Sequence, residues 1–109
     1  MSTLEFHVLL ALASAPLYGY AIKDAVATES AGALTPRAGS LYRVLARLMT
    51  SGLVAEGEPA DEPEPHPGLA RRYYALTAAG RKALAAEAAR LKRTAAVAEK
   101  RLRLAQGRS

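Results

Sequence analysis

The sequence predicts a mainly α fold with a small β-hairpin, and three observations support this prediction. Apolar residues recur at helical spacing in three segments of residues 1–52, two short strand-like stretches follow them, and a Pro-free segment of helix-forming residues ends the chain. With 109 residues and 50% hydrophobic content, the chain can form one small domain with a modest core. We therefore expect part of its stability to come from a partner subunit.

Two helices are expected in the first third of the chain. The first covers Leu4–Ser14, where apolar residues lie at helical spacing, and Pro16 is expected to stop it. The second covers Tyr18–Thr28 and has an apolar and a charged side. Gly19 at its start indicates that another segment closely approaches the backbone there.

The third expected helix has one apolar and one cationic face. The apolar residues that share a face are Leu41, Val44, Leu45 and Leu48. Ser40, Arg43 and Arg47 share another face. The helix begins either at Thr35-Pro36 or at Gly39-Ser40, and Gly52 ends it. Such a helix can pack on a small core and direct guanidinium groups into a DNA groove.

Two strands are expected after this helix. They cover Leu53–Glu56 and Arg71–Leu76, and residues 57–68 between them are too acidic and Pro-rich to pack. We interpret 57–68 as a long hairpin loop. Because side chains alternate along a strand, the pair Arg71-Arg72 is expected to point to opposite faces, with one arginine meeting DNA, and the pair Tyr73-Tyr74 divides in the same way.

The last helix is expected to begin after Thr77 as N-cap and to end near Gly107. At about 1.5 Å per residue, such a helix is roughly 45 Å long, which exceeds what a core of this size can cover. Residues spaced alternately by four and three positions follow one side: Leu84, Ala88, Leu91, Ala95, Ala98, Leu102 and Ala105. This spacing is typical of a coiled-coil seam and favours a dimerisation helix, although an Ala-rich sequence can also produce such a stripe by chance.

Charge is distributed unevenly along the chain. Residues 1–55, 56–67 and 68–109 carry net charges of +1, −5 and +9, which return the formal total of +5. The acidic segment is expected to point away from a polyanion that the basic segments face. The absence of Cys excludes disulfides and thiolate chemistry, and no apolar run has the length of a membrane span. We expect a cytoplasmic protein that does not bind membranes.

No group of residues predicts catalysis or metal binding. His7 and His66 lie far apart in sequence and lack further ligand-type neighbours, so no metal or other cofactor is expected. Paired carboxylates in an ordered context, a Ser-His-Asp arrangement and a Gly-rich phosphate loop are all absent from the pattern. We therefore expect that the chain is not an enzyme.

The order of three helices, a hairpin and a final helix is that of a winged helix-turn-helix. Four segments also match one family in the correct order: Leu10–Ile22, Gly39–Leu48, Ser51–Val54 and Arg72–Arg81. Together they resemble the PadR family of bacterial transcriptional regulators, in its short form with a single C-terminal helix. The resemblance implies a winged helix-turn-helix over residues 1–76 and a C-terminal dimerisation helix over 77–109.

The resemblance also implies partners. A PadR-like protein is expected to be a homodimeric repressor that binds a palindromic, double-stranded DNA operator, and in many relatives a small molecule near the dimer interface releases the DNA. This chain departs from the family pattern in its long acidic hairpin loop, in having no Trp to stack a drug, and in a slightly long segment before Ser40.

The residues expected to contact DNA lie on the third helix, at its start and beside the hairpin: Arg37, Ser40, Tyr42, Arg43, Arg47, Arg71 and Arg72. Tyr42 has two possible uses, since its ring can pack in the core beside Met49 while its hydroxyl reaches a phosphate. The residues expected at the dimer interface are Leu84, Ala88, Leu91, Ala95, Ala98 and Leu102. Two other functions stay open: a winged-helix module for protein contacts, and a ligand sensor with weak DNA affinity.

Overall fold

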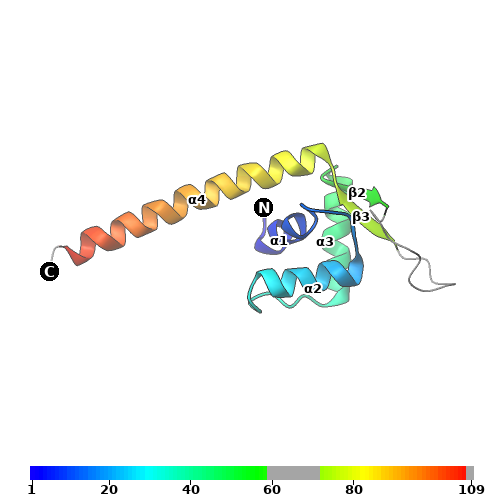
Figure 1. Cartoon of the computed structure of the whole chain (residues 1–109), viewed down its shortest axis with the longest axis horizontal. Helices are drawn as coiled ribbons and strands as arrows, with labels where there is room; N and C mark the ends of the chain where they lie inside the picture. The colour runs from blue at the N-terminus through cyan, green and yellow to red at the C-terminus, as the bar shows by residue number, and fades with distance from the viewer. Residues whose placement is uncertain (59–71, 108–109) are drawn as a thin grey trace.

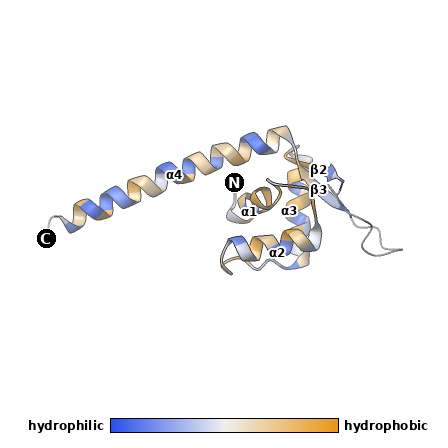
Figure 2. Cartoon of the chain, in the orientation of Figure 1, coloured by the Kyte–Doolittle hydropathy of each residue, from blue (hydrophilic) through white to orange (hydrophobic). Residues whose placement is uncertain are grey.

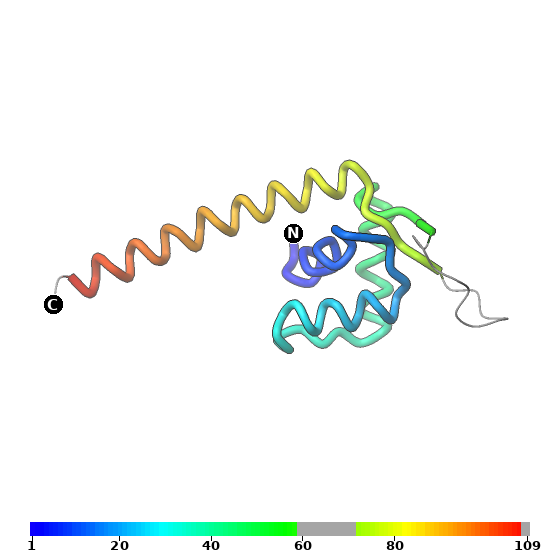
Figure 3. Tube along the Cα trace, in the orientation of Figure 1, coloured from blue at the N-terminus to red at the C-terminus, as the bar shows by residue number. Residues whose placement is uncertain are grey.

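A computed structural model describes residues 1–58 and 72–107 of the chain (Figure 1). Its elements are α1 (Thr3–Ala11), β1 (Leu17–Tyr18), α2 (Gly19–Glu29), α3 (Ala38–Thr50), β2 (Val54–Gly57), β3 (Tyr73–Leu76) and α4 (Ala78–Gln106). The first three helices and the strands pack together, and α4 extends away from them (Figure 3). The predicted fold class is confirmed: a mainly α chain with a small antiparallel sheet and a long C-terminal helix.

Helix α1 begins with a capping box that hydropathy alone did not indicate. The Ser2 hydroxyl accepts a hydrogen bond from the Glu5 N–H at 3.1 Å, and the Ser2 N–H donates to Glu5 Oε1 at 2.7 Å. The helix ends at Ala11, earlier than the predicted end at Ser14. The prediction was too long because the chain must become extended before Pro16 in order to reach the sheet.

Helix α3 begins between the two predicted starts. Arg37 is its N-cap residue, with extended backbone and no side-chain capping bond. After the helix ends at Thr50, Gly52 adopts φ +78°, a conformation that suits glycine, and the Leu53 N–H donates to the Leu48 carbonyl at 2.9 Å. This turn leads directly into β2, so the predicted end at Gly52 is confirmed within two residues.

The sheet has three antiparallel strands in the order β1-β3-β2, whereas the sequence predicted two. The additional strand β1 lies in the segment expected to start the second helix, and Leu17 pairs with Tyr74. A strand this short has no periodicity of its own, because it exists only through its pairing with β3. On the other edge, β2 pairs with β3 from Val54 opposite Leu76 to Gly57 opposite Tyr73. Gly57 therefore belongs to β2, and not to the predicted loop.

The core lies between the three short helices and the sheet (Figure 2). Its most completely buried side chains are Leu9, Leu12, Ile22, Leu41, Leu45, Val8 and Val26. All four apolar positions predicted for the third helix are at most 5% exposed. The apolar face of α3 therefore determines which way its other residues point.

Helix α4 is attached to this body only through its first turns. Thr77 caps it as predicted, since its hydroxyl accepts from the Gly80 N–H at 3.0 Å and donates to the Gly52 carbonyl at 2.6 Å. Gly80 is buried against Leu53, and Leu84 is partly buried against the core. From Ala88 to Gln106 every side chain is exposed. Whether 77–109 forms a separate functional unit stays a prediction.

Candidate nucleic-acid interface

The exposed face of α3 is a direct consequence of its buried face. Helical geometry places Gly39, Arg43, Ala46 and Thr50 opposite the buried leucines, and all four are exposed. Arg43 lies in the middle of this face and belongs to none of the ion pairs found in the described parts of the chain. The helix therefore presents a free guanidinium to solvent, as predicted from its pattern.

Arg47 has a different environment on the flank of α3 that faces α1. Its Nε lies 3.8 Å from Glu5 Oε2, and its side chain is 61% exposed whereas that of Glu5 is 22% exposed. The backbone N–H of Ser2 has the largest effect in lowering the pKa of Glu5, and the positive charge of Arg47 lowers that pKa further. The carboxylate that faces Arg47 is therefore kept ionised.

Arg37 and Ser40 lie together at the start of α3. They line the same shallow depression, which also includes Leu4 and Pro36. Arg37 is exposed, whereas Ser40 is partly buried. The start of the helix therefore offers a cation and a hydroxyl side by side, on the same flank as Arg47.

Tyr42 lies on the opposite flank, which faces α2. The predicted packing of its ring in the core beside Met49 is wrong, because Tyr42 is 50% exposed and its ring and hydroxyl lie over Gly19. One residue after Leu41 on a helix, the side chain points about 100° away from the core direction. A Cβ at Gly19 would collide with the Tyr42 hydroxyl, so the close approach predicted at this glycine is confirmed.

A groove of about 210 Å³ separates the starts of α2 and α3. Its lining combines two tyrosines and a lysine with small or apolar residues: Gly19, Tyr20, Lys23, Ala38, Leu41 and Tyr42. None of these residues is acidic, and Tyr20 is 64% exposed. The sequence reasoning missed Tyr20, although a large aromatic residue on the charged side of a short helix was the available signal.

The arginines beside the hairpin are only partly described. Arg71 and most of the predicted loop 57–68 lie outside the described residues. The Arg72 Nε donates to Glu56 Oε1 at 3.3 Å, both side chains are more than half exposed, and this hydrogen bond raises the pKa of Arg72. Arg72 is thus bound to an acid of the neighbouring strand. The expected division of Tyr73 and Tyr74 is seen, since Tyr74 is 4% exposed and Tyr73 lies against Tyr18.

The residues predicted for a dimer interface do not all have the same surroundings. Leu84 packs on the core of its own chain. The remaining five are exposed: Ala88, Leu91, Ala95, Ala98 and Leu102. Leu91 and Leu102 are 40% and 66% exposed, and they lie on the same side of the helix as the predicted seam. Val97 and Leu104 are also exposed, but helical geometry places them on the opposite side of α4.

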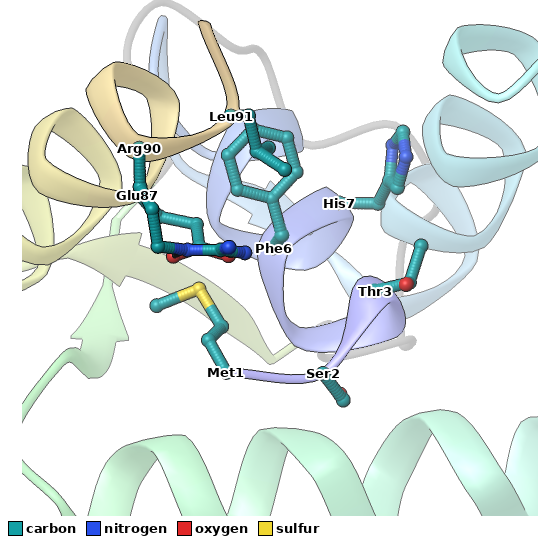
Figure 4. A pocket seen from close by; sticks show the side chains of 8 residues that line it. All are labelled: Met1, Ser2, Thr3, Phe6, His7, Glu87, Arg90 and Leu91. Atoms are coloured by element: carbon teal, nitrogen blue, oxygen red, sulfur yellow. Dashed lines mark hydrogen bonds and ion pairs between the residues drawn. The ribbon is translucent and has the colours of Figure 1, made fainter. Parts of the chain in front are cut away.

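A hollow of about 170 Å³ lies between the start of α1 and α4 (Figure 4). Phe6, Met1 and Leu91 give it an apolar side, while Glu87 and Arg90 form a bidentate ion pair with contacts of 2.6 and 2.8 Å at its edge. The His7 ring lies edge-on to the Phe6 ring with centroids 5.6 Å apart, and its Nδ1 is buried with no hydrogen-bond partner among the described residues. The hollow lies beside Leu91, which is one of the residues predicted for the dimer interface.

The described residues form neither a metal-binding cluster nor a membrane-spanning helix. No group of three or more His, Cys, Asp or Glu side chains in residues 1–58 and 72–107 is placed to hold a metal ion. None of the helices in these ranges has the length and hydropathy that a membrane crossing requires.

Three helices, a small sheet and a solvent-facing third helix define the winged helix-turn-helix class. The model of the transcriptional regulator PadR-like family matches residues 8–86, and the chain therefore belongs to this family of transcriptional regulators. The resemblance seen in the sequence is thus confirmed.

The chain is also similar to individual proteins. An uncharacterized 37.1 kDa protein in transposon TN4556 of Streptomyces fradiae is 43% identical over 81 residues, which are 74% of this chain and 21% of that protein. The chain therefore spans about a fifth of the length of this relative. A PadR family transcription regulator from Clostridium difficile R20291 has a similar fold, with a TM-score of 0.74 at 21% identity, over 93% of this chain and 99% of its own.

A second solved structure is that of Bacillus subtilis PadR in complex with operator DNA. It has a TM-score of 0.62 at 22% identity, covering 76% of this chain and 46% of that one. At this identity the comparison establishes a common fold.

Proposed function

We propose that this PadR-like regulator binds DNA sequence-specifically as a homodimer, recognises an inverted-repeat operator and represses transcription. The observation that carries the proposal is the geometry of α3, whose apolar side is buried while Arg43 projects from the centre of its exposed side. A guanidinium in this position can donate two hydrogen bonds to guanine O6 and N7 in the major groove. The related fold of Bacillus subtilis PadR, solved with operator DNA, supports the same use of this chain.

Contacts to the DNA backbone would come from both flanks of α3. On one flank, Tyr20, Lys23 and Tyr42 surround a groove without acidic residues, which suits a phosphate. On the other flank, Arg37 and Ser40 lie together at the helix start. Phosphate contacts on two sides would fix the orientation of α3 in the groove while Arg43 reads a base. Arg71 and Arg72 remain proposed contacts beside the hairpin.

The homodimer is supported by the exposed side of α4. The helix continues well past the core, and in a single chain Leu102 is 66% exposed and Leu91 is 40% exposed. Burying these leucines against a second copy would remove apolar surface from water, which provides the driving force for association. We therefore assign DNA binding to residues 1–76 and dimerisation to 77–109. A two-fold dimer binds two half-sites, which is why the operator is proposed to be an inverted repeat.

A small-molecule effector is proposed to bind near this interface. The hollow between α1 and α4 has one apolar side, to which Leu91 belongs, so a dimer partner packed on Leu91 would close it on that side. A molecule that entered it would change the packing of α4 on α1 and hence the spacing of the two recognition helices. Tryptophan stacking is excluded as a recognition mode because the chain has no Trp.

Selection from a pool of random DNA duplexes tests the proposed function. The expected result is a selected sequence with two inverted half-sites about one helical turn apart, bound in gel shifts more tightly than a scrambled duplex of the same length. Repression is tested by placing the selected site before a reporter gene, whose expression should fall when the protein is made. A protein that selects no sequence, or binds all duplexes equally, would instead favour a module for protein contacts or a ligand sensor with weak DNA affinity.

A further inference from the structure

Glu5 lies beside the proposed recognition helix, although it belongs to α1. Its two oxygens have different partners: Oε1 accepts a hydrogen bond from the Ser2 N–H at 2.7 Å, and Oε2 lies 3.8 Å from Arg47 Nε. The capping box therefore holds the carboxylate in place independently of Arg47. The Glu5 carboxylate is therefore partly buried and held in place, whereas the Arg47 side chain that it faces is mostly exposed.

Such an acid is unfavourable for DNA binding in general. A negative charge next to the proposed DNA-binding face repels phosphates, and it also attracts a guanidinium that would otherwise be free to contact any phosphate nearby. The two arginines of α3 differ in this respect, since Arg43 has no ion pair within the described residues. The capping box accounts for the position of Glu5 in α1, but it does not account for the effect that the Glu5 charge has on Arg47.

The geometry of the guanidinium indicates what that effect is. At 3.8 Å the Arg47 Nε and Glu5 Oε2 form an ion pair without a hydrogen bond, so the carboxylate acts through its charge. This charge favours orientations of the guanidinium in which the Nε edge faces Glu5 and the two Nη groups remain available on the other edge. An arginine restrained in this way bonds well to an acceptor in one position and poorly to acceptors elsewhere. Restraint therefore lowers non-specific binding more than specific binding.

We propose that Glu5 is a positioning residue that determines DNA selectivity by restraining Arg47. This inference depends on the proposed function, because it assigns a role within the same DNA interface. The ligand is double-stranded DNA, and Glu5 itself does not contact it. Its contribution lies in the ratio of specific to non-specific affinity.

The substitution Glu5→Gln isolates this role. Glutamine also occurs at this position of capping boxes, so the bond to the Ser2 N–H can be kept while the charge that faces Arg47 is removed. Binding is measured for the duplex that the wild-type protein selects from a random pool and for a scrambled duplex. We expect tighter binding to the scrambled duplex and a ratio of affinities that falls about two- to fivefold, the range of an exposed ion pair.

Four further variants separate restraint from simple charge repulsion. Glu99→Gln makes the same change of charge on the exposed distal part of α4, and should leave the ratio unchanged. In an Arg47→Ala background Glu5→Gln should no longer change the ratio, whereas in an Arg43→Ala background it should still do so. Arg47→Lys keeps the charge but lacks the Nε edge, and should lower the ratio as Glu5→Gln does.

The possible outcomes distinguish this inference from the proposed function. An unchanged ratio in Glu5→Gln, with wild-type protein that still selects a sequence, would overturn the role of Glu5 alone. An equal effect of Glu5→Gln in the presence and absence of Arg47 would also overturn it, because the acid would then act on DNA directly. A wild-type protein that selects no sequence would overturn both. A cooperative thermal transition that stays well above the assay temperature in every variant excludes a folding defect, and Arg47→Lys tests the same restraint from the α3 side.

Discussion

Arg43 and Arg47 belong to one helix but have different electrostatic surroundings. Arg43 projects from the middle of the exposed face without an acidic neighbour in the described chain, whereas Arg47 faces Glu5. Their types and spacing could be predicted from the sequence, but this difference could not. It depends on where α1 crosses α3, and hydrophobic periodicity contains no information about that crossing. The same holds for Tyr42, whose neighbour Gly19 lies on another helix.

The first prediction concerns Arg43 as a base contact. Arg43→Ala should weaken binding to the selected duplex by about 1 to 3 kcal/mol and relax the base preference at one position of each half-site. Arg93→Ala, which removes an exposed arginine of α4, serves as the matched control. A loss that is equal for all sequences, with a shallower dependence on salt, would show that Arg43 contacts phosphate instead. Affinity measurements at several salt concentrations decide between the two.

The second prediction concerns the stabilising effect of Glu5 as pH changes. Since the Ser2 N–H and Arg47 lower the pKa of Glu5 in the folded chain, the ionised group stabilises the fold above its unfolded pKa of about 4.3, and this contribution is lost as pH falls through the folded pKa. Gln cannot titrate at this position. The difference in thermal midpoint between wild type and Glu5→Gln should therefore be largest near neutral pH and disappear in acid. A difference that stays constant down to about pH 3 would contradict the folded-state role of Glu5.

At the scale of elements, long periodic segments could be predicted and short paired ones could not. The buried face of α3 and the extent of α4 agree with the sequence pattern because each depends on local periodicity and caps. The strand β1 depends on a partner far along the chain, and Leu17 opposite Tyr74 cannot be read from either segment alone. The attachment of α4 is also non-local, since Gly80 packs against Leu53 at the end of the α3 turn.

The third prediction tests this attachment. A Cβ at position 80 would collide with the Leu53 carbonyl oxygen and lie 2.7 Å from Leu76 Cδ1. Gly80→Ala should therefore destabilise the fold by about 1 to 3 kcal/mol, because overpacking against backbone outweighs the higher helix propensity of alanine. Gly39→Ala is the matched control: its Cβ would meet only Arg43 Nη1, at 3.9 Å, so its stability should be unchanged or slightly higher. Denaturant unfolding of both variants measures the difference, and equal midpoints would contradict the close packing at Gly80.

On the scale of the whole molecule, α4 is much longer than its own domain requires (Figure 1). Its first turns contact α1 and β3, Leu91 still lies beside Met1 and Phe6 of the α1 end, and the residues from Lys92 to Gln106 are all exposed in a single chain. Leu91 and Leu102 are on the side that continues from the core-packed Leu84, whereas Val97 and Leu104 are on the other side. If the side with Leu91 and Leu102 forms the dimer, one continuous side of α4 packs on its own domain near Leu84 and on the partner further along. The interface would then fix the distance between two recognition helices.

The last prediction tests which side of α4 forms that interface. The double substitution Leu91→Lys and Leu102→Lys should convert the dimer into monomers, because it places charges where apolar side chains are proposed to be buried. The matched control, Val97→Lys with Leu104→Lys, makes the same change on the opposite side and should remain dimeric. Multi-angle light scattering gives the mass of each variant over a range of concentrations, and circular dichroism checks that α4 is still helical. If the control dissociates while the first variant stays dimeric, the predicted seam is on the wrong side of α4.

A monomeric first variant should also bind DNA differently. Its affinity for a single half-site should approach that of one wild-type protomer, because the DNA-binding face is unchanged. The additional affinity that the wild-type dimer gains from two half-sites should be lost.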